Sequence, residues 1–324
     1  MTNENNANYL NMRNIFYKRF KEKCTPLLEK FEKERKVFIK IFIVLILVIF
    51  SVLFSFLAYS LYLQDSFAIF KDLSLPISSA FIIIISGIAF YSKVFENRIK
   101  KELMPILCGC FENLKWVESP RVDHSLFKNS GIITKRYDEY DLDDVFTGSY
   151  KDVSIEIVEV EYIDITRERT SDGKTRNQRN TIFDGVIITL DMNKNFISHT
   201  LVKSDKLFKT SGVQGLRHTT LEDPIFEKSF DVFTNDEVDA RYLLTPSFMD
   251  RLVNVKTIYN SSKITCAFYN DKLILAMDVR RDMFKIGSLF KKVNDEKAFI
   301  KMYEELESII KLIDHFKLDQ KIGL

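Results

Sequence analysis

The stretch VFIKIFIVLILVIFSVLFSFLAYSLYL, residues 37–63, decides the architecture of this chain. After Lys40 it carries no charge until Asp65, and it is apolar on every side, whereas a helix of a soluble core keeps a polar face. Because an α-helix rises about 1.5 Å per residue, the run exceeds the roughly 20 residues that cross a bilayer. It is too long, and begins too far into the chain, for the apolar region of a cleavable signal. The sequence therefore predicts a transmembrane helix over residues 37–63.

A second apolar run, LPISSAFIIIISGIAFY, occupies residues 75–91 and is close to the lower length limit for a span. Pro76 stands near its start, where a helix tolerates the missing N–H. The β-branched residues 82–85 also fit a buried strand, but the preceding span and the flanking charges favour a helix. We expect a second transmembrane helix over residues 75–92, joined to the first by a short external connection, residues 64–74.

The distribution of lysine and arginine predicts the orientation of these helices. Basic residues are frequent before the first run, between Lys18 and Lys36, and after the second, between Lys93 and Lys101. The connection holds only Lys71. Because cytoplasmic flanks carry the excess of positive charge, both termini are expected in the cytoplasm. The sequence thus indicates a two-pass protein of the bacterial inner (cytoplasmic) membrane, with the lipid bilayer as its first partner.

The segment before the first span, residues 1–36, is predicted to be a cytoplasmic amphipathic helical segment. Phe16, Phe20, Leu27 and Phe31 recur at helical spacing, among lysines and interleaved glutamates. An apolar face with basic flanks fits the anionic inner leaflet. It fits equally well a site on the protein's own domain or on a second copy of the chain.

Beyond the membrane region, residues 93–118 are expected to form a helical linker and residues 119–324 a cytoplasmic α+β domain. Apolar residues alternate with polar ones from Val153 to Val160, which is typical of a half-buried strand, with Glu159 placed on the polar side. A polar stretch containing Asp172-Gly173 follows and predicts the tip of a long hairpin.

Further signals complete the prediction of the soluble domain. Asn270-Asp271 separates two apolar runs and predicts a second hairpin. Thr245-Pro246 marks the start of one helix, and an apolar stripe over residues 294–316 marks a long C-terminal helix. Hairpins with segregated helices indicate a mainly antiparallel sheet with packed helices. The predicted fold class is therefore α+β, preceded by a two-helix transmembrane hairpin.

The sequence contains none of the common phosphate-binding, zinc-protease, serine-hydrolase or kinase motifs. Four cysteines, Cys24, Cys108, Cys110 and Cys266, are few and irregularly spaced, which favours reduced thiols over a disulfide framework. Asp141, Asp143 and Asp144 resemble the start of a calcium loop, but the required glycine and closing glutamate are missing. A solvated acidic turn is the favoured interpretation, and neither a cofactor nor a metal ion is predicted.

His218 lies near Glu222 and Asp223, and these three residues are the candidate catalytic group. They would support a membrane-anchored, hydrolase-like enzyme. The alternative is that His218 is a structural hydrogen-bonding residue, as a lone histidine beside carboxylates usually is. With no catalytic motif elsewhere, a non-enzymatic protein is favoured.

The polar hairpin carries the candidate binding residues of the chain. They are Arg167, Arg169, Lys174, Arg176 and Arg179. Three interpretations compete: a solvated loop, contact with anionic headgroups or an acidic protein partner, and nucleic-acid binding. Nucleic acid is disfavoured, because no aromatic residues are interleaved for base stacking and the net charge of the chain is only +2.

A longer pattern resembles a known family. Residues 221–255 read LEDPIFEKSFDVFTNDEVDARYLLTPSFMDRLVNV, and residues 264–277 read ITCAFYNDKLILAM. These motifs resemble the bacterial DUF3137 family, a domain of unknown function, and the resemblance extends over about Ser119 to Leu318. It implies a membrane-associated protein and brings no catalytic residue. The leading hypothesis is an inner-membrane protein whose cytoplasmic domain binds a protein partner or a membrane lipid, with small residues in the second span permitting helix pairing between copies.

Overall fold

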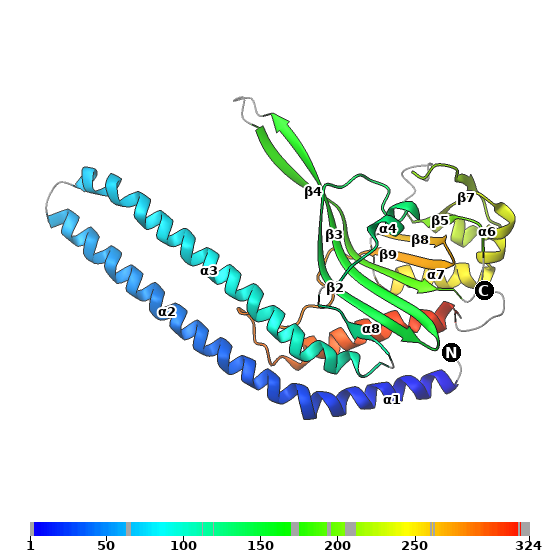
Figure 1. Cartoon of the computed structure of the whole chain (residues 1–324), viewed down its shortest axis with the longest axis horizontal. Coiled ribbons are helices and arrows are strands. Elements are labelled where there is room, and N and C mark those ends of the chain that lie inside the picture. Colours follow the sequence, from blue (N-terminus) through cyan, green and yellow to red (C-terminus); the bar gives the residue numbers. More distant parts are fainter. Residues whose placement is uncertain are drawn as a thin grey trace. The chain divides into compact units, whose positions relative to one another are not determined.

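The structure is a computed structural model of the chain (Figure 1), and it forms two compact units. It describes residues 3–62, 66–111, 113–118, 120–169, 175–192, 196–204, 212–259, 261, 263–316 and 318. The first unit comprises Met1–Ile15, Leu107–Lys285 and Met302–Leu324. The second comprises Phe16–Ile106 and Ile286–Lys301.

The second unit contains most of the long N-terminal helices. These are the end of α1 (Asn3–Arg19), the π-helical turn η1 (Phe20–Cys24), α2 (Thr25–Tyr62) and most of α3 (Ser66–Cys108). Proline explains the π-helical turn, because Pro26 has no N–H to donate and its ring crowds the carbonyl one turn earlier. The Thr25 N–H donates instead to the carbonyl of Phe20, and the helix continues.

Among the described residues, the helical stretch Ala7–Ser55 is the one long and apolar enough to cross a membrane, and none of its most apolar 18-residue window is buried. Large apolar side chains such as Phe50 and Phe54 are exposed, with 68% and 73% of their surfaces accessible. Exposure of this kind along a helix is costly in water and normal in lipid. The long apolar N-terminal helix predicted from residues 37–63 is thus present.

Side-chain contacts show that α2 and α3 pack in antiparallel order. The rings of Phe38 and Tyr91 stack with centroids 4.1 Å apart, and Phe31 meets Phe95 at 6.0 Å. The earlier residue of α2, Phe31, contacts the later residue of α3, Phe95, so the two helices run in opposite directions. Near these rings, Arg98 donates to Glu34 at 2.9 Å.

Helix α3 differs from the prediction at its start. It begins at Ser66 rather than near Pro76, and Pro76 lies inside it. The difference arises because the sequence argument located the apolar run, whereas a helix continues into polar residues as long as its backbone hydrogen bonds are satisfied.

The apolar face of the N-terminal segment packs within the protein. Phe16, Phe20 and Phe31 are buried, and Phe20 meets Phe299 of the same unit at 5.7 Å. Glu32 accepts from the Val293 N–H at 3.0 Å. Of the three interpretations offered by the sequence, these contacts favour packing against the protein's own residues.

The first unit is built on one nine-stranded sheet in the order β1-β2-β3-β4-β9-β8-β5-β7-β6, in which every neighbouring pair is antiparallel. The strands are β1 (Lys115–Trp116), β2 (Glu139–Tyr150), β3 (Val153–Arg169), β4 (Thr175–Asp191), β5 (Thr200–Lys203), β6 (Arg217–Thr219), β7 (Asp231–Thr234), β8 (Lys263–Tyr269) and β9 (Lys272–Asp278). The helices are α4 (His124–Asn129), α5 (Pro224–Ser229), α6 (Glu237–Leu243), α7 (Pro246–Ile258) and α8 (Glu296–Phe316), of which the N-terminal part of α8, up to Lys301, belongs to the second unit. The predicted α+β class with a mainly antiparallel sheet is confirmed.

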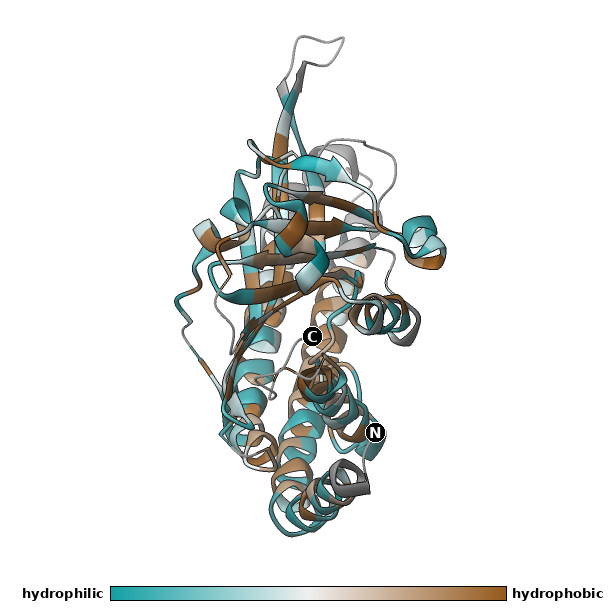
Figure 2. Ribbon diagram, turned by 90° about the vertical axis from the view of Figure 1, so that its right-hand side faces the viewer, coloured by the Kyte–Doolittle hydropathy of each residue, from teal (hydrophilic) through white to brown (hydrophobic). Residues whose placement is uncertain are grey.

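Both faces of the central strands are buried, and Figure 2 shows hydrophobic residues concentrated there. On one face, Val158 and Val160 join a core cluster with Phe127 of α4. On the other, Phe268 of β8 meets Phe248 of α7 at a centroid distance of 5.3 Å. A two-residue turn at Asn270-Asp271 links β8 to β9, and both residues have positive φ, as the predicted hairpin turn requires.

Candidate functional site

The predicted hairpin forms a two-stranded arm. Figure 1 shows β3 and β4 continuing beyond the rest of the sheet. Pairing with β2 ends at Ile163, and pairing with β9 ends at Gly185, so beyond these points β3 and β4 pair with each other up to Arg169 and Thr175. The predicted tip at Asp172-Gly173 lies outside the described residues.

The register distributes the arginines of the arm over both of its faces. Arg167 pairs with Asn177, and Ile165 pairs with Arg179, so Arg167 and Arg179 share a face. Arg176, one position away, lies on the opposite face. All three are exposed. The backbone of Arg169 pairs with Thr175, and the fifth candidate, Lys174, lies outside the described residues.

Acidic groups partly neutralise the positive charge at the base of the arm. Arg179 pairs with Glu139 of β2 at 2.8 Å, and Arg136 lies 3.5 Å from Asp138. A depression of about 620 Å³ opens at this base. It is lined by Arg136, Asp138, Asp164, Ile165, Thr166, Arg167 and Asn177. Its donors and acceptors suit a polar, extended ligand better than an apolar one.

The candidate catalytic residues each have a structural partner. The His218 ring on β6 lies 3.6 Å from Asp231 and packs edge-on against Phe233. Asp223 caps α5 by accepting from the N–H groups of Ile225 and Phe226, as its position before Pro224 predicts.

Glu222 is almost fully exposed and lies 3.9 Å from the Arg241 guanidinium. Together, these contacts do not unite His218, Glu222 and Asp223 in one acid–base arrangement.

A group of four carboxylates lies elsewhere, where a bulge interrupts the pairing of β2 with β3. Leu142 pairs with Val160 and Val145 with Val158, so Asp143 and Asp144 together stand opposite the single residue Glu159. A bulge of this kind turns the extra residue out of the regular alternation.

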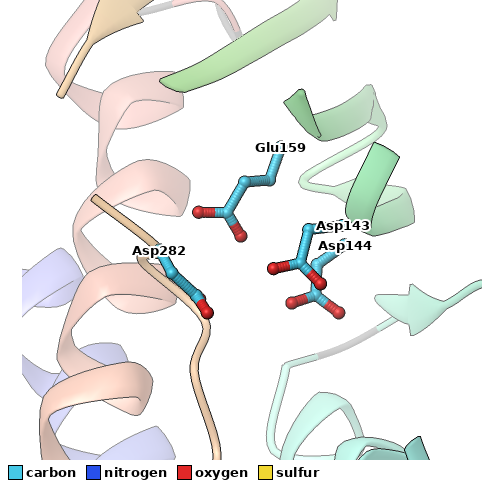
Figure 3. Close-up of side chains that lie close together, drawn as sticks. All are labelled: Asp143, Asp144, Glu159 and Asp282. Carbon is cyan, nitrogen blue, oxygen red and sulfur yellow. The ribbon is translucent and has the colours of Figure 1, made fainter. Parts of the chain in front are cut away.

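Asp282, in the segment that follows β9, completes the group (Figure 3). One oxygen from each of the four carboxylates lies within 4.8 Å of the others. The term carboxylate cluster is used below for Asp143, Asp144, Glu159 and Asp282.

Hydrogen bonds hold two members of the cluster in place. The Trp116 indole Nε1 of β1 donates to Asp144 Oδ1 at 2.8 Å, and the Met283 N–H donates to Glu159 Oε1 at 2.6 Å. Asp144 is fully buried, and Glu159 exposes 5% of its surface.

Glu159 is held in an unfavourable electrostatic environment. Burial, followed by the neighbouring charges of Asp282, Asp144 and Asp143, raises the pKa of Glu159 to about 9, against the effect of the Met283 N–H. The second oxygen of Glu159, Oε2, has no hydrogen-bond partner among the described residues. The cluster can therefore hold a proton or a cation.

Two predictions about these residues are wrong. Asp143 and Asp144 lie in a strand rather than in a solvated turn, and Asp144 is buried. Glu159, assigned to the polar side of its strand, is buried. The sequence carried one signal, because Glu159 is an even number of residues from Val153 and Ile157 and so shares their face in a regular strand.

The cysteines follow their prediction. All four are buried and none forms a disulfide within the described part of the chain, and burial raises the pKa of the Cys108 thiol to about 12. A thiol held in this state is a poor nucleophile and a poor metal ligand.

The fold and these features define an α+β protein with one long apolar N-terminal helix, a projecting arm and a carboxylate cluster that is half buried. Residues 181–318 match the model of the DUF3137 family, described as a protein of unknown function. The match confirms the resemblance found from residue 221 onward. Asp282 falls inside the matched region, whereas Asp143, Asp144 and Glu159 precede it.

A search of curated proteins finds no match. Among solved structures, the chain is similar to the crystal structure of the mycobacterial trehalose monomycolate transport factor A, TtfA. The identity is 7%, the TM-score is 0.28, and the alignment covers 59% of this chain and 97% of that chain. At this TM-score the likeness carries no conclusion about the present chain.

Proposed function

We propose that the chain crosses the bacterial inner membrane twice, with the α+β domain and both termini in the cytoplasm. The antiparallel contacts between α2 and α3 support two spans, because they bring the apolar run of residues 75–91 alongside the exposed apolar part of α2. The basic residues before the first run and after the second support the orientation.

Cysteine labelling tests this topology directly. The four native cysteines are buried, so a cysteine introduced by Gln64→Cys is the accessible thiol under native conditions. A membrane-impermeant maleimide should label Q64C in intact spheroplasts and should label the control Lys128→Cys, at an exposed position of α4, only after lysis. Labelling of K128C before lysis, or of Q64C only after it, would overturn the orientation.

Within this topology, we propose that the domain is a non-enzymatic binding module whose arm captures an extended, acidic segment of a partner protein. The observation that carries the proposal is the projecting pair of strands with exposed arginines on both faces. Two-stranded ribbons have marginal stability alone, and their outer edges keep backbone groups available for another strand.

The outer edge of the arm fits strand addition. Among the described strands, none but β3 pairs with β4 from Thr175 to Phe183. A partner strand added there would gain main-chain hydrogen bonds, while Arg167 and Arg176 would contact acidic side chains on its two faces. This geometry favours a protein partner over a lipid headgroup, which offers charge but no backbone edge.

Photo-crosslinking in cells that carry the native membrane tests the arm. A photoreactive residue at Asn177 should give a protein adduct that the double variant Arg167→Glu, Arg176→Glu abolishes. The matched control is Arg217→Glu, on the exposed edge strand β6 at the far side of the sheet, which should leave the adduct intact.

The other outcomes are equally informative. An adduct of twice the chain mass would identify a second copy as the partner. The partner would instead be lipid if no protein adduct forms and the purified chain floats with anionic vesicles. In that case the double variant should no longer float with them. Equal loss of the adduct in R217E would refute a role for the arm.

A further inference from the structure

The spacing of the carboxylate cluster is compatible with a bound Ca²⁺ ion. Calcium–oxygen bonds measure about 2.3–2.6 Å, so two oxygens on opposite sides of Ca²⁺ lie roughly 4.6–5.2 Å apart. The four cluster oxygens all lie within 4.8 Å of one another, a separation that one Ca²⁺ ion can span. Four carboxylates also favour Ca²⁺ over Mg²⁺, because Mg²⁺ usually keeps several waters and takes only one or two carboxylates.

The donor set agrees with a hard cation. All four donors are carboxylate oxygens, the ligands that Ca²⁺ prefers, and no nitrogen or sulfur ligand belongs to the group. They come from β2, β3 and the segment after β9, and the bulge places two of them opposite a third. Trp116 and Met283 each occupy one oxygen of a carboxylate and fix its orientation, as supporting donors do around metal sites.

An independent observation points to a ligand in this space. Oε2 of Glu159 is buried without a hydrogen-bond partner among the described residues, and Figure 3 shows the Glu159 carboxylate directed between Asp282 and the two β2 aspartates. An unsatisfied buried oxygen is costly and calls for a partner. A bound cation would satisfy it.

Positive charge from the protein also reaches the cluster. Lys285 lies 3.5 Å from Asp282 at the exposed side, and a cation would share this carboxylate with it. Asp143, Asp144 and Asp282 have further polar contacts of their own. The inference therefore rests on the spacing of the four oxygens and on the unsatisfied oxygen of Glu159. From these two observations, we infer that Asp143, Asp144, Glu159 and Asp282 form a binding site for one Ca²⁺ ion.

Terbium, which takes the place of Ca²⁺ at oxygen sites and luminesces when a nearby indole is excited, provides the probe. Trp116 is the single tryptophan of the chain and contacts Asp144, so it reports on this site. The full chain, in detergent and freed of metal by a chelator, is titrated with Tb³⁺ under selective excitation of tryptophan. We expect saturation at one ion per chain, displacement by Ca²⁺, and displacement by Mg²⁺ only at much higher concentration.

Variants decide whether the ion sits in the cluster. Asp143→Asn alters an exposed member and should weaken binding by about tenfold or more without loss of folding. Glu159→Gln keeps the shape and the acceptor for the Met283 N–H and should weaken binding likewise. Asp141→Asn removes an exposed carboxylate of the same strand and should change nothing.

Two results would overturn the inference. One is the absence of sensitised terbium emission together with the absence of calorimetric heat from Ca²⁺, which would mean that protons and protein cations alone neutralise the cluster. The other is equal weakening by D141N and D143N, which would mean diffuse attraction to the surface. Neither result bears on the arm, whose test uses different residues and a different readout.

Discussion

Glu159→Gln should remove a pH-dependent penalty on folding, and the structure sets its size. Burial and the charges of three acidic neighbours raise the pKa of Glu159 from an ordinary value of 4.5 to about 9, against the opposing effect of the Met283 N–H. In the unfolded chain the carboxyl ionises near 4.5. Between these values the folded state holds one proton more than the unfolded state, so stability falls as pH rises.

The magnitude follows from proton linkage. Each pH unit inside this window changes the free energy of unfolding by about 1.36 kcal/mol, and integration from pH 5 to pH 7 gives about 2.5 kcal/mol. Wild type should lose this much stability relative to E159Q over the interval. Glutamine keeps the side-chain shape and the acceptor for Met283, so the variant isolates ionisation from packing.

Denaturant unfolding of the full chain in detergent and chelator, followed by Trp116 fluorescence at both pH values, measures the difference. Asp141→Asn, an exposed carboxylate on the strand that bears the bulge, is the control and should follow wild type. Parallel pH dependence of wild type and E159Q would refute the reasoning, because it would show that Glu159 ionises in the folded protein as readily as in the unfolded one.

Three further variants test the packing and the local structure of the domain by the same unfolding assay. Phe248→Ala should cost about 3–5 kcal/mol, because Phe248 is fully buried against Phe268 and Phe316, and a cost below about 1 kcal/mol would contradict the described core. Asp223→Ala should cost about 1 kcal/mol by removing the cap of α5, whereas Asp223→Ser should retain most of it; equal losses would contradict a capping role. Asn270→Val should cost about 1–2 kcal/mol, because its φ of 51° disfavours a β-branched residue, and Asn270→Gly should be tolerated; the reverse order would contradict the turn.

Local patterns predicted the elements that depend on neighbours in sequence. The apolar run of residues 37–63, the hairpin at Asn270-Asp271 and the C-terminal helix all follow from periodicity and turn chemistry, which act over a few residues. The structure has each of them, with α8 beginning at Glu296 close to the expected start.

Features that depend on contacts between residues far apart in the chain could not be predicted from the sequence. The carboxylate cluster exists because β2 pairs with β3 across a bulge and because the chain returns after β9 to bring in Asp282. No spacing rule connects Asp144 with Asp282, and the calcium-loop pattern sought in the sequence describes ligands from one continuous loop. Likewise, β5 lies between β8 and β7, an order set by long-range contacts rather than by local signals.

The faces of β3 show why alternation misled the assignment of Glu159. Alternation separates exposed from buried residues when one face of a sheet meets water. At the centre of this sheet both faces are covered, so Ile157, Val158 and Glu159 are buried in succession. A carboxylate in such a position is retained against its desolvation cost, and buried ionisable groups of this kind concentrate at functional sites.

The carboxylate cluster and the arm share β3, yet the strand order makes them separable. Glu159 lies where β3 is paired on both sides, with β2 and with β4, and is held within the sheet. The arm begins past Ile163, where β2 ends and β3 keeps one neighbour. If both proposals hold, ion occupancy is expected to act on the stability of the sheet and the arginines on capture of a partner, so that each variant reports on one of the two.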